Sequence, residues 1–110
     1  MPKTQRIIKT FEAINEALLM SMKKNKNVVL IGLGDDDPKG IFGTTKNIEK
    51  NLKQKKKRVF DFPTAENAMT GIALGASISG IVPIITHQRV EFSLLSVEQI
   101  FNQIAKWHFM

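Results

Sequence analysis

Three short apolar segments, separated by helical patterns, constrain the fold of this chain more than any other feature. Residues 28–31 read Val-Val-Leu-Ile, an unbroken run rich in β-branched residues, which predicts a strand buried on both faces of a parallel sheet. Further strands are predicted at residues 59–61 and 82–86, where Pro83 is tolerated near the strand's start. Strands that alternate with helices predict an α/β fold with a mainly parallel sheet and flanking helices.

Four segments are typical of helices. The first runs from Phe11 to Met22 with apolar residues at helical spacing and Thr10 as its predicted N-cap. A short polar helix is predicted at residues 45–54, and a helix of small and apolar residues at about residues 65–79. The last helix is amphipathic, with one stripe made of Val97, Ile100, Phe101, Ile104, Ala105 and His108. Three strands and an uncapped helical end predict that residues 1–110 are the N-terminal portion of a longer domain.

The formal net charge of +6 is concentrated in two basic clusters, residues 23–26 and 53–58. Because no aromatic residue is interleaved with them, a solvated face is the preferred interpretation, and a basic nucleic-acid-binding module stays as an alternative. The absence of cysteine excludes disulfides and thiolate metal sites and suits the cytoplasm, which we predict as the compartment. Acidic residues interrupt the N-terminal region and no segment could span a bilayer, so neither a signal peptide nor a membrane partner is predicted.

Residues 32–40 form a loop rich in glycine and aspartate directly after the first strand. Its Gly-Leu-Gly start suggests a dinucleotide-binding turn, but the third glycine of that motif would fall on Asp37, and three successive aspartates would repel a pyrophosphate. Consecutive acidic side chains rarely converge on one ion, and the spacing of a calcium loop is absent. We therefore predict that Asp35, Asp36 and Asp37 lie in a solvated loop and that the chain has no metal site.

A single carboxylate, Glu66, opens a helix that otherwise has almost no polar face, in the segment FDFPTAENAMTGIALGAS at residues 60–77. Thr64 is the predicted cap, and an acid in the first turn is favoured by the helix dipole, which is a sufficient structural explanation. The apolar composition also predicts that this helix is buried. An acid at its tip would then point into the crevice beyond the carboxyl ends of the strands, where open α/β sheets bind ligands.

The segment from Arg58 to Met110 resembles the pyrimidine-binding domain of thiamine-diphosphate enzymes. The strongest stretches are RVFDFPTAENAMTGIALGAS and VEQIFNQIAKWHF, and the likeness begins at about Lys9 with TFEAINEAL. It is most similar to the beta subunit of 2-oxo acid dehydrogenases of the pyruvate type, and transketolase-like proteins share the domain. The resemblance implies an incomplete transketolase-like pyrimidine-binding domain over residues 1–110.

The same resemblance implies roles for three residues. Glu66 matches the glutamate that binds a ring nitrogen of the cofactor's aminopyrimidine and favours the imino tautomer that activates thiamine diphosphate. Phe92 falls where an aromatic ring lies against the pyrimidine, although core packing is an equally good explanation. Gln88 falls near a pocket position after the third strand, and His87 is predicted on the opposite face. We predict that His108 packs in the core or at a subunit interface.

The chain departs from the family pattern in two places. Leu33 stands where the beta subunits usually have an acid that links active sites, and this leaves the substrate class open. The Gly-Asp-Gly motif that binds Mg²⁺ and the diphosphate is absent, so the resemblance implies that an alpha-type subunit or a missing domain supplies it. We thus predict a homo- or hetero-oligomer in which the isolated chain is inactive. Alternatives are a ketol-transfer enzyme fragment of the transketolase type and a non-catalytic assembly module.

Overall fold

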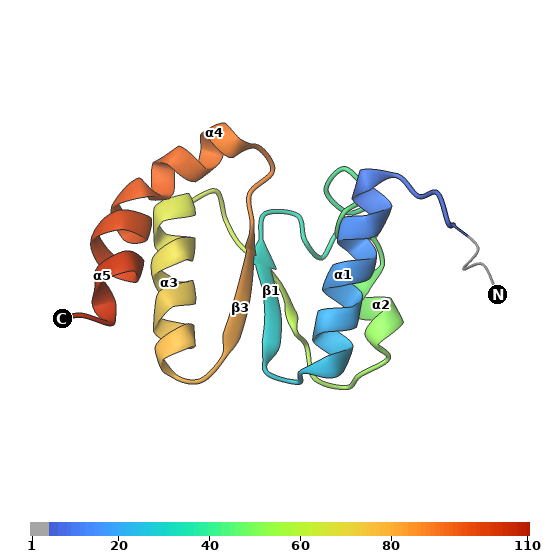
Figure 1. Cartoon of the computed structure of the whole chain (residues 1–110), viewed down its shortest axis with the longest axis horizontal. Coiled ribbons are helices and arrows are strands. Elements are labelled where there is room, and N and C mark those ends of the chain that lie inside the picture. Colours follow the sequence, from blue (N-terminus) through green and yellow to red (C-terminus); the bar gives the residue numbers. More distant parts are fainter. Residues whose placement is uncertain (1–4) are drawn as a thin grey trace.

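The computed structural model describes residues 5–110 and has helices on both sides of a small sheet (Figure 1). In chain order its first six elements are α1 (Thr10–Lys24), β1 (Val28–Gly32), α2 (Ile48–Leu52), β2 (Val59–Asp61), α3 (Glu66–Ile78) and β3 (Val82–Thr86). A continuous helical segment follows, made of α4 (Val90–Ser93), a 3₁₀ turn (Leu94–Ser96), a π-helical stretch (Gln99–Ile104) and α5 (Ala105–Trp107).

The three strands are parallel and lie in the order β2-β1-β3. In the register, Leu30 pairs with Val59 on one side of β1 and with Ile84 on the other. The central strand is buried over almost its whole length, as its apolar run predicts. The predicted α/β class is therefore confirmed, with α1 and α2 on one face of the sheet and α3 and the C-terminal segment on the other (Figure 1).

The two faces of the sheet bury unequal cores. Seven residues form the buried cluster on the α1 and α2 side: Leu18, Met22, Val28, Leu30, Ile48, Leu52 and Val59. The cluster on the α3 side contains only Ile31, Met69 and Ala73. Met22, Leu30 and Met69 have no solvent exposure at all.

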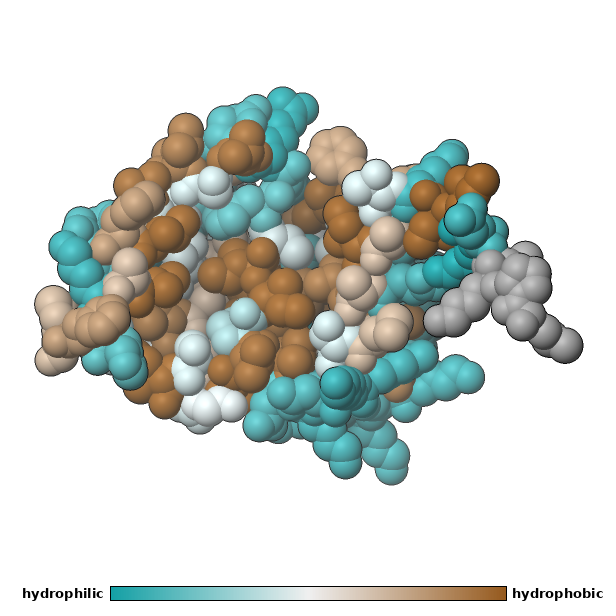
Figure 2. All heavy atoms as spheres, in the orientation of Figure 1, coloured by the Kyte–Doolittle hydropathy of each residue, from teal (hydrophilic) through white to brown (hydrophobic). Residues whose placement is uncertain are grey.

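The prediction that α3 is buried holds for only one of its faces. Ile72 and Ile78 are 52% and 55% exposed, because α3 places only one face on the sheet. The apolar stripe predicted for the last helix is also open to solvent, with Phe101 63% exposed. Figure 2 shows the result, since apolar residues gather over the α3 and α5 side of this view while hydrophilic residues crowd its lower edge.

The helix boundaries correct several local predictions. Thr10 lies inside α1, whose N-cap is Lys9, and the Lys9 backbone N–H donates to the Glu12 carboxylate at 2.7 Å. Thr64 is not a cap either, because α3 is preceded by Ala65. The helix predicted at residues 45–54 is shorter, since positive φ angles at Asn47 and Lys53 bound it on both sides. Over the described part of the chain, no helix combines the length and apolar character needed to cross a membrane.

Candidate active site

The carboxyl ends of the three strands meet at one edge of the sheet. Gly32 at the end of β1 pairs with Asp61 of β2 and with Thr86 of β3. The chain leaves this edge through three connections, namely the 33–40 loop, the link to α3, and residues 87–89 before α4. Parallel α/β sheets bind ligands at this edge, because loops and helix N-termini converge there. All three predicted site residues lie in or just after these connections.

Glu66 is the first residue of α3 and is only 6% exposed. The first turn of α3 is held in place, because the Thr70 hydroxyl lies 2.8 Å from the Glu66 carbonyl and 2.9 Å from Ser96 Oγ. These contacts join α3 to the C-terminal segment. Within residues 5–110, no donor forms a hydrogen bond with the Glu66 carboxylate itself. A buried carboxylate at a helix N-terminus is therefore left with its side-chain oxygens free for an external partner.

Gln88 and Phe92 follow β3, and α4, which contains Phe92, leads into the 3₁₀ turn whose Ser96 contacts Thr70 near the start of α3. Gln88 is exposed, and its Nε2 donates to the Leu33 carbonyl across a long 3.4 Å. Phe92, in α4, is half-buried. His87 is half-buried where Gln88 is exposed, in keeping with predicted opposite faces, and its Nδ1 is buried without a partner. The structure thus brings these residues to one edge but does not enclose them in one pocket.

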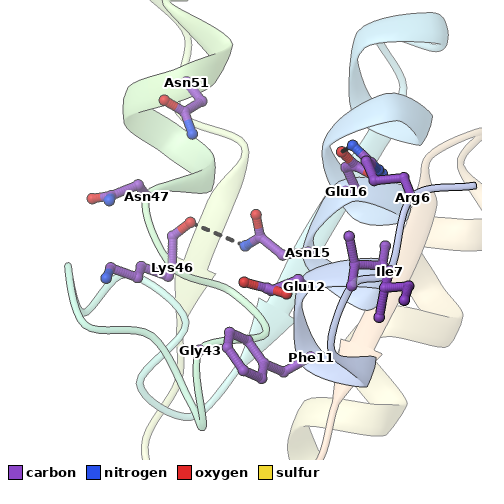
Figure 3. A pocket seen from close by; sticks show the side chains of 11 residues that line it. Arg6, Ile7, Phe11, Glu12, Asn15, Glu16, Gly43, Lys46, Asn47 and Asn51 are labelled. Carbon is purple, nitrogen blue, oxygen red and sulfur yellow. Dashed lines mark hydrogen bonds and ion pairs between the residues drawn. The ribbon is translucent and has the colours of Figure 1, made fainter. Parts of the chain in front are cut away.

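A hollow that contains none of these residues lies elsewhere, beside the N-terminal end of α1 (Figure 3). It has a volume of about 660 Å³, and its wall includes an ion pair between Arg6 and Glu16. Asn15 closes its floor by donating to the carbonyls of Thr44 and Lys46 at 2.9 and 3.0 Å. None of the predicted site residues lines it.

Asp35 was missed by the sequence reasoning, which placed it in a solvated loop. It is 2% exposed, whereas its neighbours Asp36 and Asp37 are exposed as predicted. Burial raises the pKa of Asp35 to about 6, with a smaller raising effect from Asp61 and an opposing effect from the Thr86 hydroxyl. The only sequence signal was its place at a strand's carboxyl end, because its partner Thr86 is 51 residues away.

Metal ligands do not cluster in the described structure. Among residues 5–110 there is no group of three or more histidine, aspartate or glutamate side chains arranged to hold an ion.

A parallel sheet covered by helices on both faces, with a buried carboxylate opening the helix after β2, defines a ligand-binding α/β domain. The chain belongs to the family described as the transketolase, pyrimidine binding domain, which matches residues 6–110. The resemblance predicted from the sequence is confirmed by this match.

Three relatives show how the chain compares with longer proteins. It is 37% identical over 99 residues to the pyruvate dehydrogenase E1 component subunit beta of Mycoplasma genitalium, covering 90% of the chain and 30% of the relative. It is 34% identical over 105 residues to the acetoin:2,6-dichlorophenolindophenol oxidoreductase subunit beta of Cupriavidus necator, covering 89% and 31%. The mitochondrial pyruvate dehydrogenase subunit beta of Saccharomyces cerevisiae is 30% identical over 99 residues, covering 90% and 26%. The chain therefore spans less than a third of the length of each.

Proposed function

We propose that this chain is the pyrimidine-binding part of a beta-type subunit of a thiamine-diphosphate-dependent 2-oxo acid dehydrogenase. In this proposal Glu66 binds the aminopyrimidine ring of the cofactor. The observation that carries it is Glu66 itself, a residue only 6% exposed that opens α3 and whose carboxylate accepts no hydrogen bond from the other described residues. The names of the relatives support the reaction class, since they include beta subunits of pyruvate dehydrogenase and of an acetoin oxidoreductase.

The residues at the carboxyl edge fit an aminopyrimidine. Such a ring has polar nitrogens at its rim and apolar faces, so it requires one or two polar partners and shielding from water. Glu66 offers carboxylate oxygens in a site that excludes most water, and Phe92 offers a half-buried aromatic surface. Gln88 offers the oxygen and the second N–H of its amide, because among the described residues the amide makes only the 3.4 Å contact with Leu33.

When bound, thiamine diphosphate supplies the electron sink that decarboxylation of a 2-oxo acid requires. The task of Glu66 is to hold a proton between one carboxylate oxygen and a ring nitrogen, and its burial strengthens that hydrogen bond. The ties from Thr70 to the Glu66 carbonyl and to Ser96 hold the helix tip in place, which keeps the carboxylate at a constant position.

Partners are part of the proposal. The chain has no Gly-Asp-Gly sequence, so we assign the Mg²⁺ and the diphosphate to an alpha-type subunit or to a further domain. The exposed apolar residues of α3 and the C-terminal segment support an assembly with other polypeptide. We expect the isolated chain to be inactive in the absence of its partners in a homo- or hetero-oligomeric enzyme, and we keep the cytoplasm as the predicted compartment because the chain has no cysteine.

Two substrate classes fit the relatives. Pyruvate, with acetyl transfer, is the first candidate because relatives from six organisms carry the pyruvate dehydrogenase name. Acetoin is the second, because the beta subunits of two acetoin oxidoreductases are 34% and 33% identical to the chain.

The test is a Glu66→Gln variant assayed in a complex with an alpha-type subunit. We expect turnover to fall about 100-fold to 10,000-fold, the range for loss of a positioned proton-transfer group, while the complex still assembles. Glu49→Gln is the matched control, because Glu49 is an exposed acid in the first turn of α2. Near-normal turnover in the Glu66 variant would refute the proposed role and favour the assembly or nucleic-acid alternatives.

A further inference from the structure

Asp35 has an unusual arrangement of contacts for a loop aspartate. Its two carboxyl oxygens lie 2.6 and 2.7 Å from the same atom, Thr86 Oγ1, at the end of β3. A hydroxyl group has one proton, so the two oxygens of an ionised Asp35 would have to share this single donor. A carboxyl group that carries a proton of its own can donate it back to the hydroxyl oxygen, and each of the two contacts then has its own proton. The geometry therefore fits a neutral, protonated Asp35.

Gly32 makes this contact possible. A Cβ at position 32 would overlap Thr86 Oγ1 and would lie 2.5 Å from Asp35 Oδ2. The ends of β1 and β3 and the loop that contains Asp35 are thus packed closely together, with no room for an added methyl group at position 32.

The same loop reaches one of the proposed pocket residues. Two residues before Asp35, the Leu33 carbonyl accepts the hydrogen bond from Gln88 Nε2. The next residue, Gly34, donates its backbone N–H to the Asp61 carboxylate at the end of β2. The position of the Leu33 carbonyl is therefore set by how the loop is held on both sides.

We propose that Asp35 is a positioning residue for the candidate cofactor site: its protonated carboxyl group fastens the 33–40 loop to Thr86 and thereby holds the Leu33 carbonyl where it orients Gln88. This inference rests on the proposed function, since it assigns Gln88 to the pyrimidine pocket. Ionisation of Asp35 places a buried charge beside Asp61 and Asp36 with one hydroxyl donor for both oxygens, so the loop loosens and Gln88 loses its partner.

The charges around Asp35 favour the neutral form. Asp61 faces it from β2 and Asp36 from the loop, and both raise its pKa beyond the effect of burial. The hollow beside Asp35 is also lined by Asp37 and, from α2, by Glu49 and Lys50. Lys57 lies 3.6 Å from Asp36 rather than against Asp35. His87 lies between Thr86 and Gln88 in the sequence and is the ionisable side chain that a control variant has to remove.

The experiment is an NMR titration of the ¹⁵N-labelled 110-residue chain. It runs from about pH 4.5 to about pH 8, which covers the expected transition of Asp35, since ordinary carboxyl and imidazole groups have pKa values of about 4 and 6.5. The signals to follow are the Gln88 side-chain NH₂ and the Gly34 amide. In the wild-type chain we expect both to shift together with a midpoint of about 6. In Asp35→Asn, whose amide can both donate to and accept from Thr86, we expect both signals to stay at their low-pH positions throughout.

Two further variants separate the possible origins of the transition. Asp37→Asn, an exposed acid-to-amide change in the same loop, and His87→Asn are both expected to retain it. Loss of the transition in His87→Asn with retention in Asp35→Asn would overturn the proposal, as would Gln88 signals that do not move with pH. A Thr86→Val variant, which removes the hydroxyl, is expected to show the high-pH signals at every pH.

The result is independent of the cofactor. Glu66→Gln should leave this titration unchanged while it abolishes turnover in the reconstituted complex. A titration that behaves as expected beside a Glu66 variant with normal turnover would refute the proposed function alone. Absence of the expected titration, together with loss of turnover in Glu66→Gln, would refute only the role of Asp35.

Discussion

The two faces of the sheet differ in how many apolar side chains they bury. On the α1 and α2 face, seven buried residues form a closed core. On the α3 face only three residues are buried, and large apolar side chains such as Ile72 remain in contact with water. The closed face supplies the stability of the fold, while the open face carries Glu66 at its edge and offers surface to other polypeptide. Most of the buried core thus lies on one side of the three strands, and the residue on which the proposed function rests lies on the other.

The most direct test of this difference is to truncate one side chain of similar size on each face of the sheet. Leu30→Ala removes a side chain with no solvent exposure from the closed core, and we expect it to lower the free energy of unfolding by about 2–5 kcal/mol. Ile72→Ala removes a half-exposed side chain and should cost less than about 1 kcal/mol. Urea denaturation followed by circular dichroism measures both. Equal losses would show that the α3 face is as well packed as the other.

Alanine substitutions at two glycines test the same difference in packing at single positions. Gly32→Ala places a methyl group against Thr86 and Asp35, and we expect it to cost about 1–3 kcal/mol through overpacking. Gly75, in the middle of α3, has no other atom within 4 Å of the place that an added methyl group would take, so Gly75→Ala should stabilise the helix by about 0.5–1 kcal/mol. Thermal unfolding of both variants measures whether each substitution lowers or raises the stability of the fold. A destabilised Gly75 variant would mean that α3 is covered in solution.

A further expected effect is on the pH dependence of stability. The pKa of Asp35 is about 6 in the folded chain against 3.8 for a free aspartate, so the folded state binds the proton more tightly. The resulting stabilisation is fully present below pH 3.8 and is lost as the pH rises through about 6. We expect a loss of about 1–2 kcal/mol, after allowing for partial screening by solvent.

The measurement is the urea midpoint at a series of pH values for the wild-type chain and for Asp35→Asn. The variant should lack the decrease between pH 4 and pH 6 that Asp35 causes, a range that follows from its two pKa values. An identical decrease in the variant would assign it to other carboxylates.

The strands and the order of the helices could be predicted from the sequence because their signals are local. The run at residues 28–31 has the burial on both faces that its composition indicates, and Glu66 lies at a buried helix tip as its apolar neighbours indicate. Helix caps were less predictable. Thr64 has the right chemistry for a cap, but the turn after Pro63 places Ala65 at that position.

The burial of α3 was predicted from its composition, and composition does not reveal how many neighbours a helix has. Ile72 is apolar in either environment, and its exposure depends on which other segments reach that face. The same reason explains the open stripe at Phe101.

By itself, the sequence determined the α/β class, the parallel strands and the family, since periodicity, apolar runs and motif blocks are properties of neighbouring residues. Only the tertiary structure decided that Asp35 is buried while Asp36 and Asp37 are not. Three adjacent aspartates are chemically identical, and what distinguishes one of them is a hydroxyl group 51 residues away that folding brings within 2.6 Å. Contacts between distant residues depend on the path of the whole chain, and no local pattern encodes them.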